Sequence, residues 1–210
     1  RGLGDVYKRQ LIGAAAAAAE YNGVEKASHI KDKLTEMTHL NETIYATGVA
    51  ASYQSHETTS GAYICDDMLA NVCKHHVTKF TYEIGRLAQD IAGGLVATFP
   101  SQKDFDHPKI GILLKKYLKG QKDIPTENRV RILRLIENMT LGRNAVGYLT
   151  ESMHGAGSPQ AQRIQIAREM QIEFKKTLAL KLSGIKNNNS ENLTNEITDY
   201  FARVFSPPES

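Results

Sequence analysis

An acidic residue and a glycine-rich turn lie close together in the segment Glu151–Arg163, and both are residue types that take part in chemistry. We expect a helix to end near Met153, and the glycines that follow can adopt left-handed or crowded backbone. Glu151 stands one turn before this break, where its carboxylate can reach into a cleft. A carboxylate suits proton transfer when burial brings its pKa toward neutrality.

The residues after the glycines are typical of a helix start. Ser158 is suited to the N-cap and Pro159 to the first helical position. Free backbone N–H groups at such a start can bind a phosphate or a carbonyl oxygen. The segment therefore predicts a carboxylate beside a ligand-binding turn, and a plain helix–turn–helix connector is the alternative that the residues leave open.

A second group of residues with possible ligand contacts lies at the end of an earlier amphipathic stretch. Gln89 precedes the pair Gly93 and Gly94, and Arg86 lies one turn before Gln89. An arginine at this place can bind phosphate oxygens. An ion pair for Arg86, and a simple helix end with small packing residues for the glycines, are the alternatives.

Two cysteines and two histidines suggest a metal site at first sight, but their spacing argues against one. Cys65 and Cys73 are eight positions apart, so on a helix they share a face without reaching one tetrahedral ion, even with His75 and His76 nearby. Two cysteines also provide no disulfide framework, and a reducing, cytoplasmic setting is expected.

The first ten residues have a different origin in our interpretation. Residues 1–10 back-translate without a mismatch to the end of a sequencing adapter, and the chain has no initiator Met. We expect a native sequence that begins near Leu11 and was truncated on its N-terminal side. Residues 1–10 carry a net charge of +2, so the formal +3 of the chain falls to +1 and gives no support to nucleic-acid binding.

The elements that must position these residues are predicted to be helical nearly throughout. An alanine-rich run ends at Gly23, and apolar residues then recur at helical spacing with no sustained alternation of period two. The run of apolar residues at 11–19 is too short to span a bilayer. We predict an all-α bundle in residues 11–185, followed by a polar linker, a short helix and a tail in 186–210. The expected helices are 11–21, 24–56, 62–79, 82–95, 110–118, 126–153, 160–182 and 195–205.

Several stretches resemble the 4-hydroxybutyryl-CoA dehydratases, a family within the 4-hydroxyphenylacetate 3-hydroxylase superfamily, and together they span residues 11 to about 181. The resemblance implies the C-terminal helical domain of an acyl-CoA dehydrogenase-like fold. The matching stretches are Leu11–Ala16, Lys26–Leu34, Leu69–Lys74, Glu83–Gly94 and Glu151–Arg163.

The resemblance also implies roles for the two groups of residues. Glu151 corresponds to an active-site glutamate that handles protons on a CoA thioester, and the turn of Gly155, Ala156, Gly157 and Ser158 corresponds to a loop that contacts FAD. The stretch with Arg86, Gln89, Gly93 and Gly94 is similar to a Gln-x-x-Gly-Gly pattern that approaches the flavin pyrophosphate of a neighbouring subunit. The spacing here differs from that pattern by one residue.

The activity implied is dehydration of 4-hydroxybutyryl-CoA to crotonyl-CoA, with isomerisation of vinylacetyl-CoA. The family uses FAD and a [4Fe-4S] cluster, and the cluster's three cysteines and one histidine would lie upstream of Leu11. An acyl-CoA substrate and a homotetramer follow from the same resemblance, with no nucleic-acid or membrane partner. The chain alone is expected to be inactive.

Two other interpretations remain open from the sequence. One is a flavin-dependent aromatic hydroxylase of the same superfamily, which would lack the cluster ligands. The other is a non-catalytic helical oligomerisation module, which predicts that Glu151 and the turn at 155–158 lie on open surface.

Overall fold

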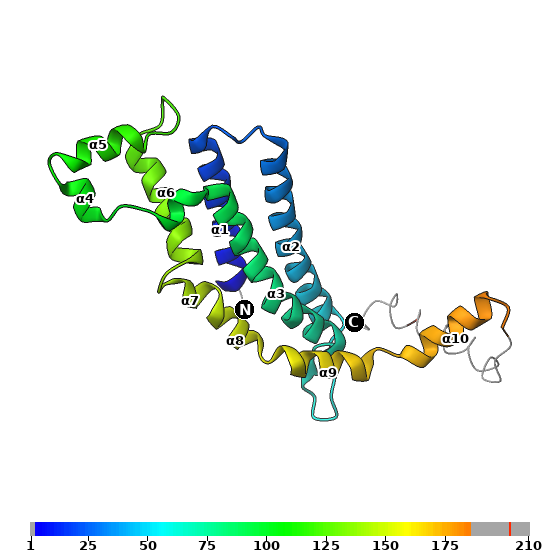
Figure 1. Ribbon diagram of the computed structural model, residues 1–210. Helices are drawn as coiled ribbons and strands as arrows, with labels where there is room; N and C mark the ends of the chain where they lie inside the picture. Colours follow the sequence, from blue (N-terminus) through cyan, green and yellow to red (C-terminus); the bar gives the residue numbers. More distant parts are fainter. Residues whose placement is uncertain (1–2, 186–201, 203–210) are drawn as a thin grey trace.

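The computed structural model describes residues 3–185 and residue 202, and within them the chain is almost entirely helical (Figure 1). This confirms the all-α prediction. The predicted helix at 195–205 and the linker before it lie outside the described residues, apart from residue 202. The elements are α1 (Leu3–Asn22), α2 (Ser28–Tyr53), β1 (His56–Glu57), β2 (Tyr63–Ile64), α3 (Asp67–Ala92), the 3-10 turn η1 (Gly94–Ala97), α4 (Gln102–Asp106), α5 (Ile110–Tyr117), α6 (Thr126–Thr140), α7 (Ala145–Tyr148), α8 (Thr150–Ala156), α9 (Pro159–Glu169) and α10 (Ile172–Leu182).

A bundle of α1, α2, α3 and α6 holds the hydrophobic core, and α3 lies in contact with each of the other three helices (Figure 1). The alanine-rich face of α1 is buried, and such small side chains let neighbouring helices approach closely. Larger side chains fill the remaining space. The largest fully buried ones are Met37, Ile84, Leu133, Ile136, Met139 and the polar Asn41.

Helix α2 carries the apolar stripe that the sequence predicts. Ile30, Met37 and Ala51 are buried on it. Cys73 of α3 packs against Gly48, and its sulfur would be in ordinary van der Waals contact, at 3.5 Å, with a Cβ placed there. The helix is shorter than the predicted 24–56, because Gly23 with φ of +74° ends α1 and a turn precedes Ser28.

Helix α1 begins at Leu3 instead of the predicted Leu11, so this boundary prediction was wrong. Tyr7 packs edge-on against Tyr148 with ring centroids 4.9 Å apart, and Arg9 forms an ion pair of 2.9 Å with Glu42. Residues in front of an alanine-rich helix extend it at little cost, since elongation is easier than nucleation. The adapter origin of residues 1–10 therefore stays a prediction.

The prediction of two helices at 62–79 and 82–95 was also wrong, because α3 is one continuous helix of 26 residues. No glycine or proline stands between Lys79 and Tyr82, and Thr81 is buried against the bundle, so packing carries the helix through. The helix ends at Ala92 before Gly93, whose φ is +80°. This agrees with the alternative interpretation of Gly93 and Gly94 as a simple helix end.

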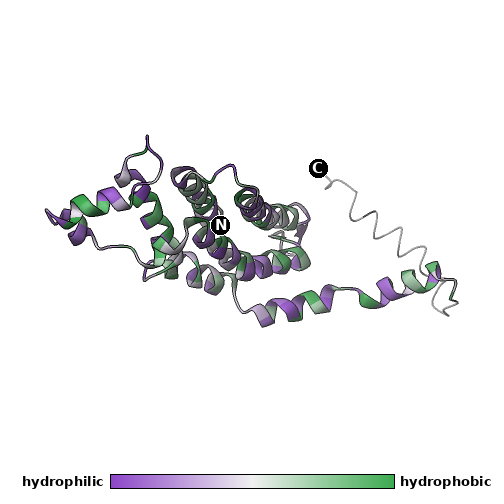
Figure 2. Ribbon diagram, turned by 45° about the horizontal axis from the view of Figure 1, so that its top comes forward, coloured by the Kyte–Doolittle hydropathy of each residue, from purple (hydrophilic) through white to green (hydrophobic). Residues whose placement is uncertain are grey.

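The two long C-terminal helices of the prediction are each broken. The expected helix 126–153 ends at Thr140, with Gly142 at φ +61°, and α7 and α8 follow as separate short helices. The expected helix 160–182 is interrupted at Gln171, which has φ of +45°, and α10 then extends away from the bundle with none of its residues buried (Figures 1 and 2).

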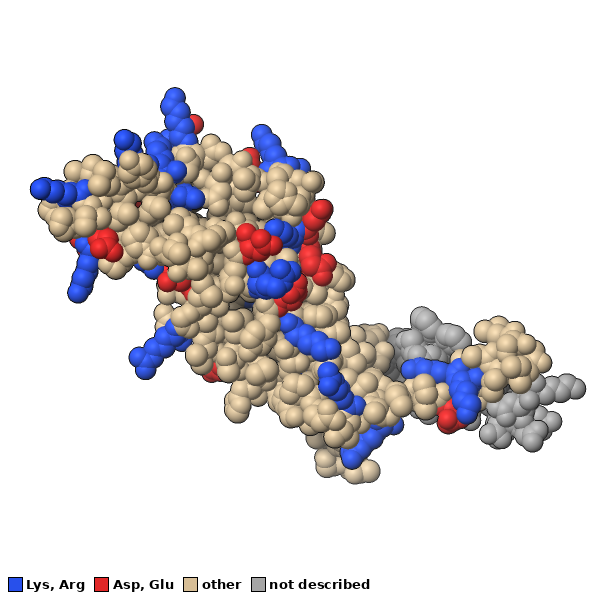
Figure 3. All heavy atoms as spheres, in the orientation of Figure 1, with Lys and Arg blue, Asp and Glu red and all other residues tan. Residues whose placement is uncertain are grey.

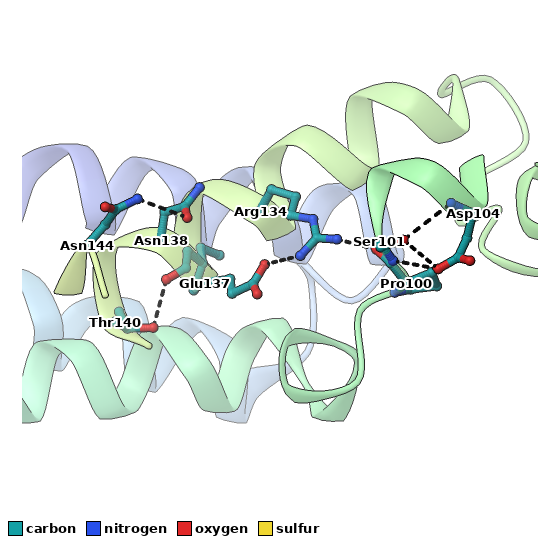
Figure 4. Close-up of polar contacts among 9 residues, drawn as sticks. Pro100, Ser101, Asp104, Arg134, Glu137, Asn138, Thr140 and Asn144 are labelled. Carbon is teal, nitrogen blue, oxygen red and sulfur yellow. Dashed lines mark hydrogen bonds and ion pairs between the residues drawn. The ribbon is translucent and has the colours of Figure 1, made fainter. Parts of the chain in front are cut away.

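A pair of short helices, α4 and α5, forms an arm on the side of the bundle opposite to α10 (Figure 1). Arg134 of α6 holds the base of this arm (Figure 4). The guanidinium donates to the backbone oxygen of Pro100 and to Glu137, and it lies 4.3 Å from the ring centroid of Phe99. Ser101 then caps α4 in a reciprocal pair of hydrogen bonds with Asp104. Residues 102–106, where the sequence predicts no helix, thus form a short capped helix.

The remaining elements are local. Strands β1 and β2 pair antiparallel around the loop at 58–61, which the sequence places as a loop. Lys, Arg, Asp and Glu side chains are interspersed over the face that α2 and α3 present (Figure 3). None of the described helices is long and apolar enough to cross a membrane.

Candidate functional site

The turn between α8 and α9 has the capping geometry that the sequence predicts. Ser158 accepts a hydrogen bond from the backbone N–H of Ala161 at 3.4 Å, and Pro159 stands in the first turn of α9. Helix α8 ends at Ala156, three residues later than the expected Met153, so Gly155 is helical. Gly157 alone takes the special conformation, with φ of +90° and ψ of −179°.

The space next to Gly155 and Gly157 in this turn is open. A Cβ added at Gly155 or at Gly157 would meet no heavy atom within 4 Å. A flat ligand can therefore approach the backbone closely on this side, which is a common use of glycine at binding turns.

The buried side chain of Gln162 stabilises the turn through hydrogen bonds to its backbone. Gln162, which is 2% exposed, donates from Nε2 to the backbone oxygen of Ala156 at 2.9 Å and to that of Gly157 at 3.1 Å. Its Oε1 is buried and has no partner among the described residues. An unpaired buried acceptor of this kind costs about 1–3 kcal/mol. Gln162 lies within the segment Glu151–Arg163, but no periodicity in the sequence indicates that this side chain is buried.

A groove of about 400 Å³ lies beside the turn, where the start of α9 faces the first turns of α3. Its lining is mostly polar. The residues are Asp67, Asn71 and Lys74 of α3, Ala156–Ser158 of the turn, and Ala161, Gln162 and Gln165 of α9. The groove depends on α3 crossing α9, which the sequence pattern does not reveal.

Glu151 lies in the first turn of α8 with an exposed side chain. Its Oε2 is 3.5 Å from the place that a Cβ at Gly147 would occupy, so the carboxylate leans back over α7. Glu151 is not among the residues that line the groove. The described residues therefore place the carboxylate and the turn on one short helix without enclosing them in one cavity.

The second predicted group lies elsewhere on α3. Arg86 pairs with Glu83 on the same helix at 2.6 Å, and the hydrogen bond from Arg86 lowers the pKa of the Glu83 carboxyl. Gln89 donates to the backbone oxygen of Thr140 at 3.1 Å and ties α3 to the end of α6. At 1.5 Å per residue, Gln89 lies about 22 Å along the helix beyond Lys74, so this group and the groove are distant within one chain. Cofactor contacts by Arg86, Gln89, Gly93 and Gly94 stay predictions.

The cysteines and histidines near the start of α3 have structural contacts. The Cys73 thiol donates to the backbone oxygen of Ile44 at 3.4 Å, and the His76 ring stacks on Phe80 with centroids 4.6 Å apart. Burial, together with the neighbouring His75, lowers the pKa of His76. Among residues 3–185, no group of three His, Cys, Asp or Glu side chains is arranged to hold a metal ion.

Residues 6–184 match the family model described as 4-hydroxyphenylacetate 3-hydroxylase C-terminal. The chain belongs to this family. The match extends from α1 to the residues just after α10, so it contains both groups of predicted site residues.

Within the family, the chain is similar to dehydratases at high identity. It is 55% identical over 193 residues to the 4-hydroxybutyryl-CoA dehydratase/vinylacetyl-CoA-Δ-isomerase of Clostridium aminobutyricum. The matched region covers 88% of this chain and 39% of that protein. A solved 4-hydroxybutyryl-CoA dehydratase from N. maritimus, described as oxygen tolerant, is 67% identical with a TM-score of 0.84, over 97% of this chain and 40% of that one. These comparisons confirm the resemblance found in the sequence, and this chain spans about two fifths of the length of both relatives.

Monooxygenases of the family are more distant. The oxygenase component of 4-hydroxyphenylacetate 3-monooxygenase from Thermus thermophilus is 28% identical over 62% of this chain and 27% of that protein. A solved oxygenase component of the same activity, in complex with FAD and 4-hydroxyphenylacetate, is 23% identical with a TM-score of 0.73, over 84% of this chain and 37% of that one. This second likeness shows the fold alone.

Proposed function

We propose that this chain is the C-terminal part of an enzyme that dehydrates 4-hydroxybutyryl-CoA to crotonyl-CoA and isomerises vinylacetyl-CoA. The observation that carries the proposal is the 55% and 67% identity to dehydratases, against 28% and 23% to the two monooxygenase components described above. The same difference favours dehydration over the hydroxylase alternative. The chain without the rest of the enzyme is inactive in this proposal, and the whole enzyme is a cytoplasmic homotetramer.

The shape and the polar surroundings of the turn at Gly155–Ser158 are compatible with a bound flavin. The space above Gly155 and Gly157 is open, and the groove beside the turn offers polar groups. We propose that Gly155, Ala156, Gly157 and Ser158 contact FAD at this turn, and that Arg86, Gln89, Gly93 and Gly94 approach the pyrophosphate of a neighbouring subunit's FAD. FAD supplies electron-transfer chemistry when bound, while the protein positions and polarises the substrate.

The proposed [4Fe-4S] cluster does not fit the described residues, which hold no group of three His, Cys, Asp or Glu side chains near one point. Its ligands belong to the part of the enzyme upstream of Leu11 in this proposal. No step of the mechanism is derived through the cluster.

Glu151 is proposed to move a proton of the acyl-CoA substrate. Its carboxylate is exposed here, so the surrounding cavity would be completed by protein outside the described residues. A water-excluding cavity there would bring the carboxylate into direct contact with the substrate proton, as general acid–base catalysis requires. A non-catalytic oligomerisation module would also leave Glu151 exposed. A measurement of turnover distinguishes the catalytic proposal from this alternative.

The test is a chimera in which residues 11–185 of this chain replace the matching segment of the N. maritimus dehydratase. Glu151→Gln keeps the size of the side chain but removes its proton chemistry, so we expect the variant to retain FAD and lose turnover by about 100-fold or more. The unsubstituted chimera is the control. Turnover by Glu151→Gln close to that of the control would reject the catalytic role.

A further inference from the structure

Gln162 occupies an unusual position for an amide side chain. It is almost completely buried in α9, and both hydrogens of its Nε2 are used on the backbone oxygens of Ala156 and Gly157. These two oxygens belong to the two peptide groups that flank Gly157. A single side chain therefore fixes the direction of both carbonyl groups.

The orientation of this amide is set by chemistry. A carbonyl oxygen accepts and cannot donate, so only the NH₂ end of Gln162 can face Ala156 and Gly157. The Oε1 end is left buried and unpartnered among the described residues. If this position only needed to be filled, an apolar side chain of similar size would serve without burying an unpaired oxygen. The amide is therefore explained by the two hydrogen bonds that it donates.

The other contacts of the turn leave its two carbonyl groups to Gln162. Gly157 is in a backbone conformation that only glycine adopts readily, and the cap from Ser158 to Ala161 is long at 3.4 Å. The carbonyl groups of a glycine turn rotate easily when nothing holds them. The backbone N–H of Gly157 donates to His154 at 3.0 Å, but it is the two bonds from Gln162 that engage the carbonyl oxygens of Ala156 and Gly157.

We propose that Gln162 is a positioning residue that holds the turn at 156–158 in the shape required to orient the flavin. The inference rests on the proposed function, because it takes the turn to be the flavin contact. Gln162 itself touches neither substrate nor cofactor in this proposal, and it acts through the two carbonyl groups.

The experiment uses the same chimera, loaded with FAD, in three variants. Gln162→Met fills the space and cannot donate, and Gln162→Glu places acceptor oxygens against two carbonyl oxygens. Gln160→Glu is the control, since Gln160 is an exposed residue of the same helix outside the groove. The readouts are the melting temperature, the visible absorbance and circular dichroism of the bound flavin, kcat and KM.

We expect Gln162→Met to fold and bind FAD with a shifted flavin spectrum. Its kcat falls by about 10- to 100-fold with little change in KM, because a misplacement of roughly 1 Å at a reacting group costs about that much. Gln162→Glu is affected more strongly, and Gln160→Glu behaves like the unsubstituted chimera.

A folded Gln162→Met with unchanged spectrum and with kcat within twofold of the chimera overturns the inference. Failure of both Gln162 variants to fold also overturns it, since the residue would then serve the fold. If the unsubstituted chimera folds but has neither bound flavin nor turnover, the proposed function fails instead, so the two failures are distinguishable.

Discussion

The bundle of α1, α2, α3 and α6 and the segment α7–α9 are held together in different ways. The bundle buries fully enclosed side chains on every helix, such as Ala15, Met37, Ile84 and Leu133. The segment α7–α9 buries only Ala145 and Gln162 among its residues, and turns and polar contacts give it its shape. Apolar burial thus stabilises the bundle, while the segment that carries the proposed site remains open to a ligand and to neighbouring protein.

The largest expected effect tests the bundle. Leu133→Ala removes a side chain that is 0% exposed, and we expect a loss of about 2–5 kcal/mol in the free energy of unfolding. Leu135→Ala on the same helix removes the same atoms at 41% exposure and should cost about 1 kcal/mol or less. Urea unfolding of the chain, followed by circular dichroism, gives both values. Equal losses would mean that α6 is not packed as described.

The next effect tests the turn of the segment. Gly157→Ala forces a side chain into φ of +90° and should cost about 1–3 kcal/mol. Gly155→Ala lies inside α8 and should be neutral or stabilising by up to about 1 kcal/mol, because alanine favours helix. Neither new Cβ meets a heavy atom within 4 Å, so the comparison isolates backbone strain. A Gly157→Ala variant as stable as Gly155→Ala would contradict the turn.

A third prediction compares the two helix caps. Asp66 accepts from the backbone N–H of Leu69 at 2.7 Å, whereas the cap at Ser158 is 3.4 Å long. Replacing a cap by alanine costs about 0.5–2 kcal/mol. We expect Asp66→Ala near the upper end and Ser158→Ala near the lower end in the same urea assay. The reverse order would show that the segment is held more firmly than the bundle.

The smallest effect concerns the ion pair that links α2 to α3. Lys33 and Asp90 are 2.7 Å apart, and Asp90→Asn should cost about 0.2–1 kcal/mol, less at high salt. The hydrogen bond from Lys33 lowers the pKa of Asp90 from its ordinary value of 3.8. The stabilisation is therefore present above pH 3.8 and is lost as the pH falls through the lowered pKa.

Urea midpoints of the chain and of Asp90→Asn, measured at neutral pH and at roughly pH 2–3, check this dependence. The difference between the two proteins should shrink at the acid end. Glu83→Gln, which removes a pair within α3, is the control for a contact that links no second helix. A difference that stays constant with pH would exclude ionised Asp90 as its source.

Much of the fold could be predicted because local signals are strong in this chain. The alanine-rich run, the stop at Gly23 and the start at Ser158 and Pro159 each act through neighbouring residues, and the structure confirms all three. The break at Gln171 gives no such signal, since a glutamine at φ of +45° is not marked by its residue type. The continuity of α3 also depends on its neighbours in space.

The sequence by itself determined that the chain is all-helical, where several helices start or stop, and that a carboxylate and a glycine turn are neighbours. The tertiary structure alone decided that Gln162 is buried, that a groove forms beside the turn, and that Glu151 stays exposed. The physical reason is that helix formation follows from contacts three or four residues apart, whereas burial of Gln162 requires α3 to lie across α9. That crossing joins residues far apart in the chain.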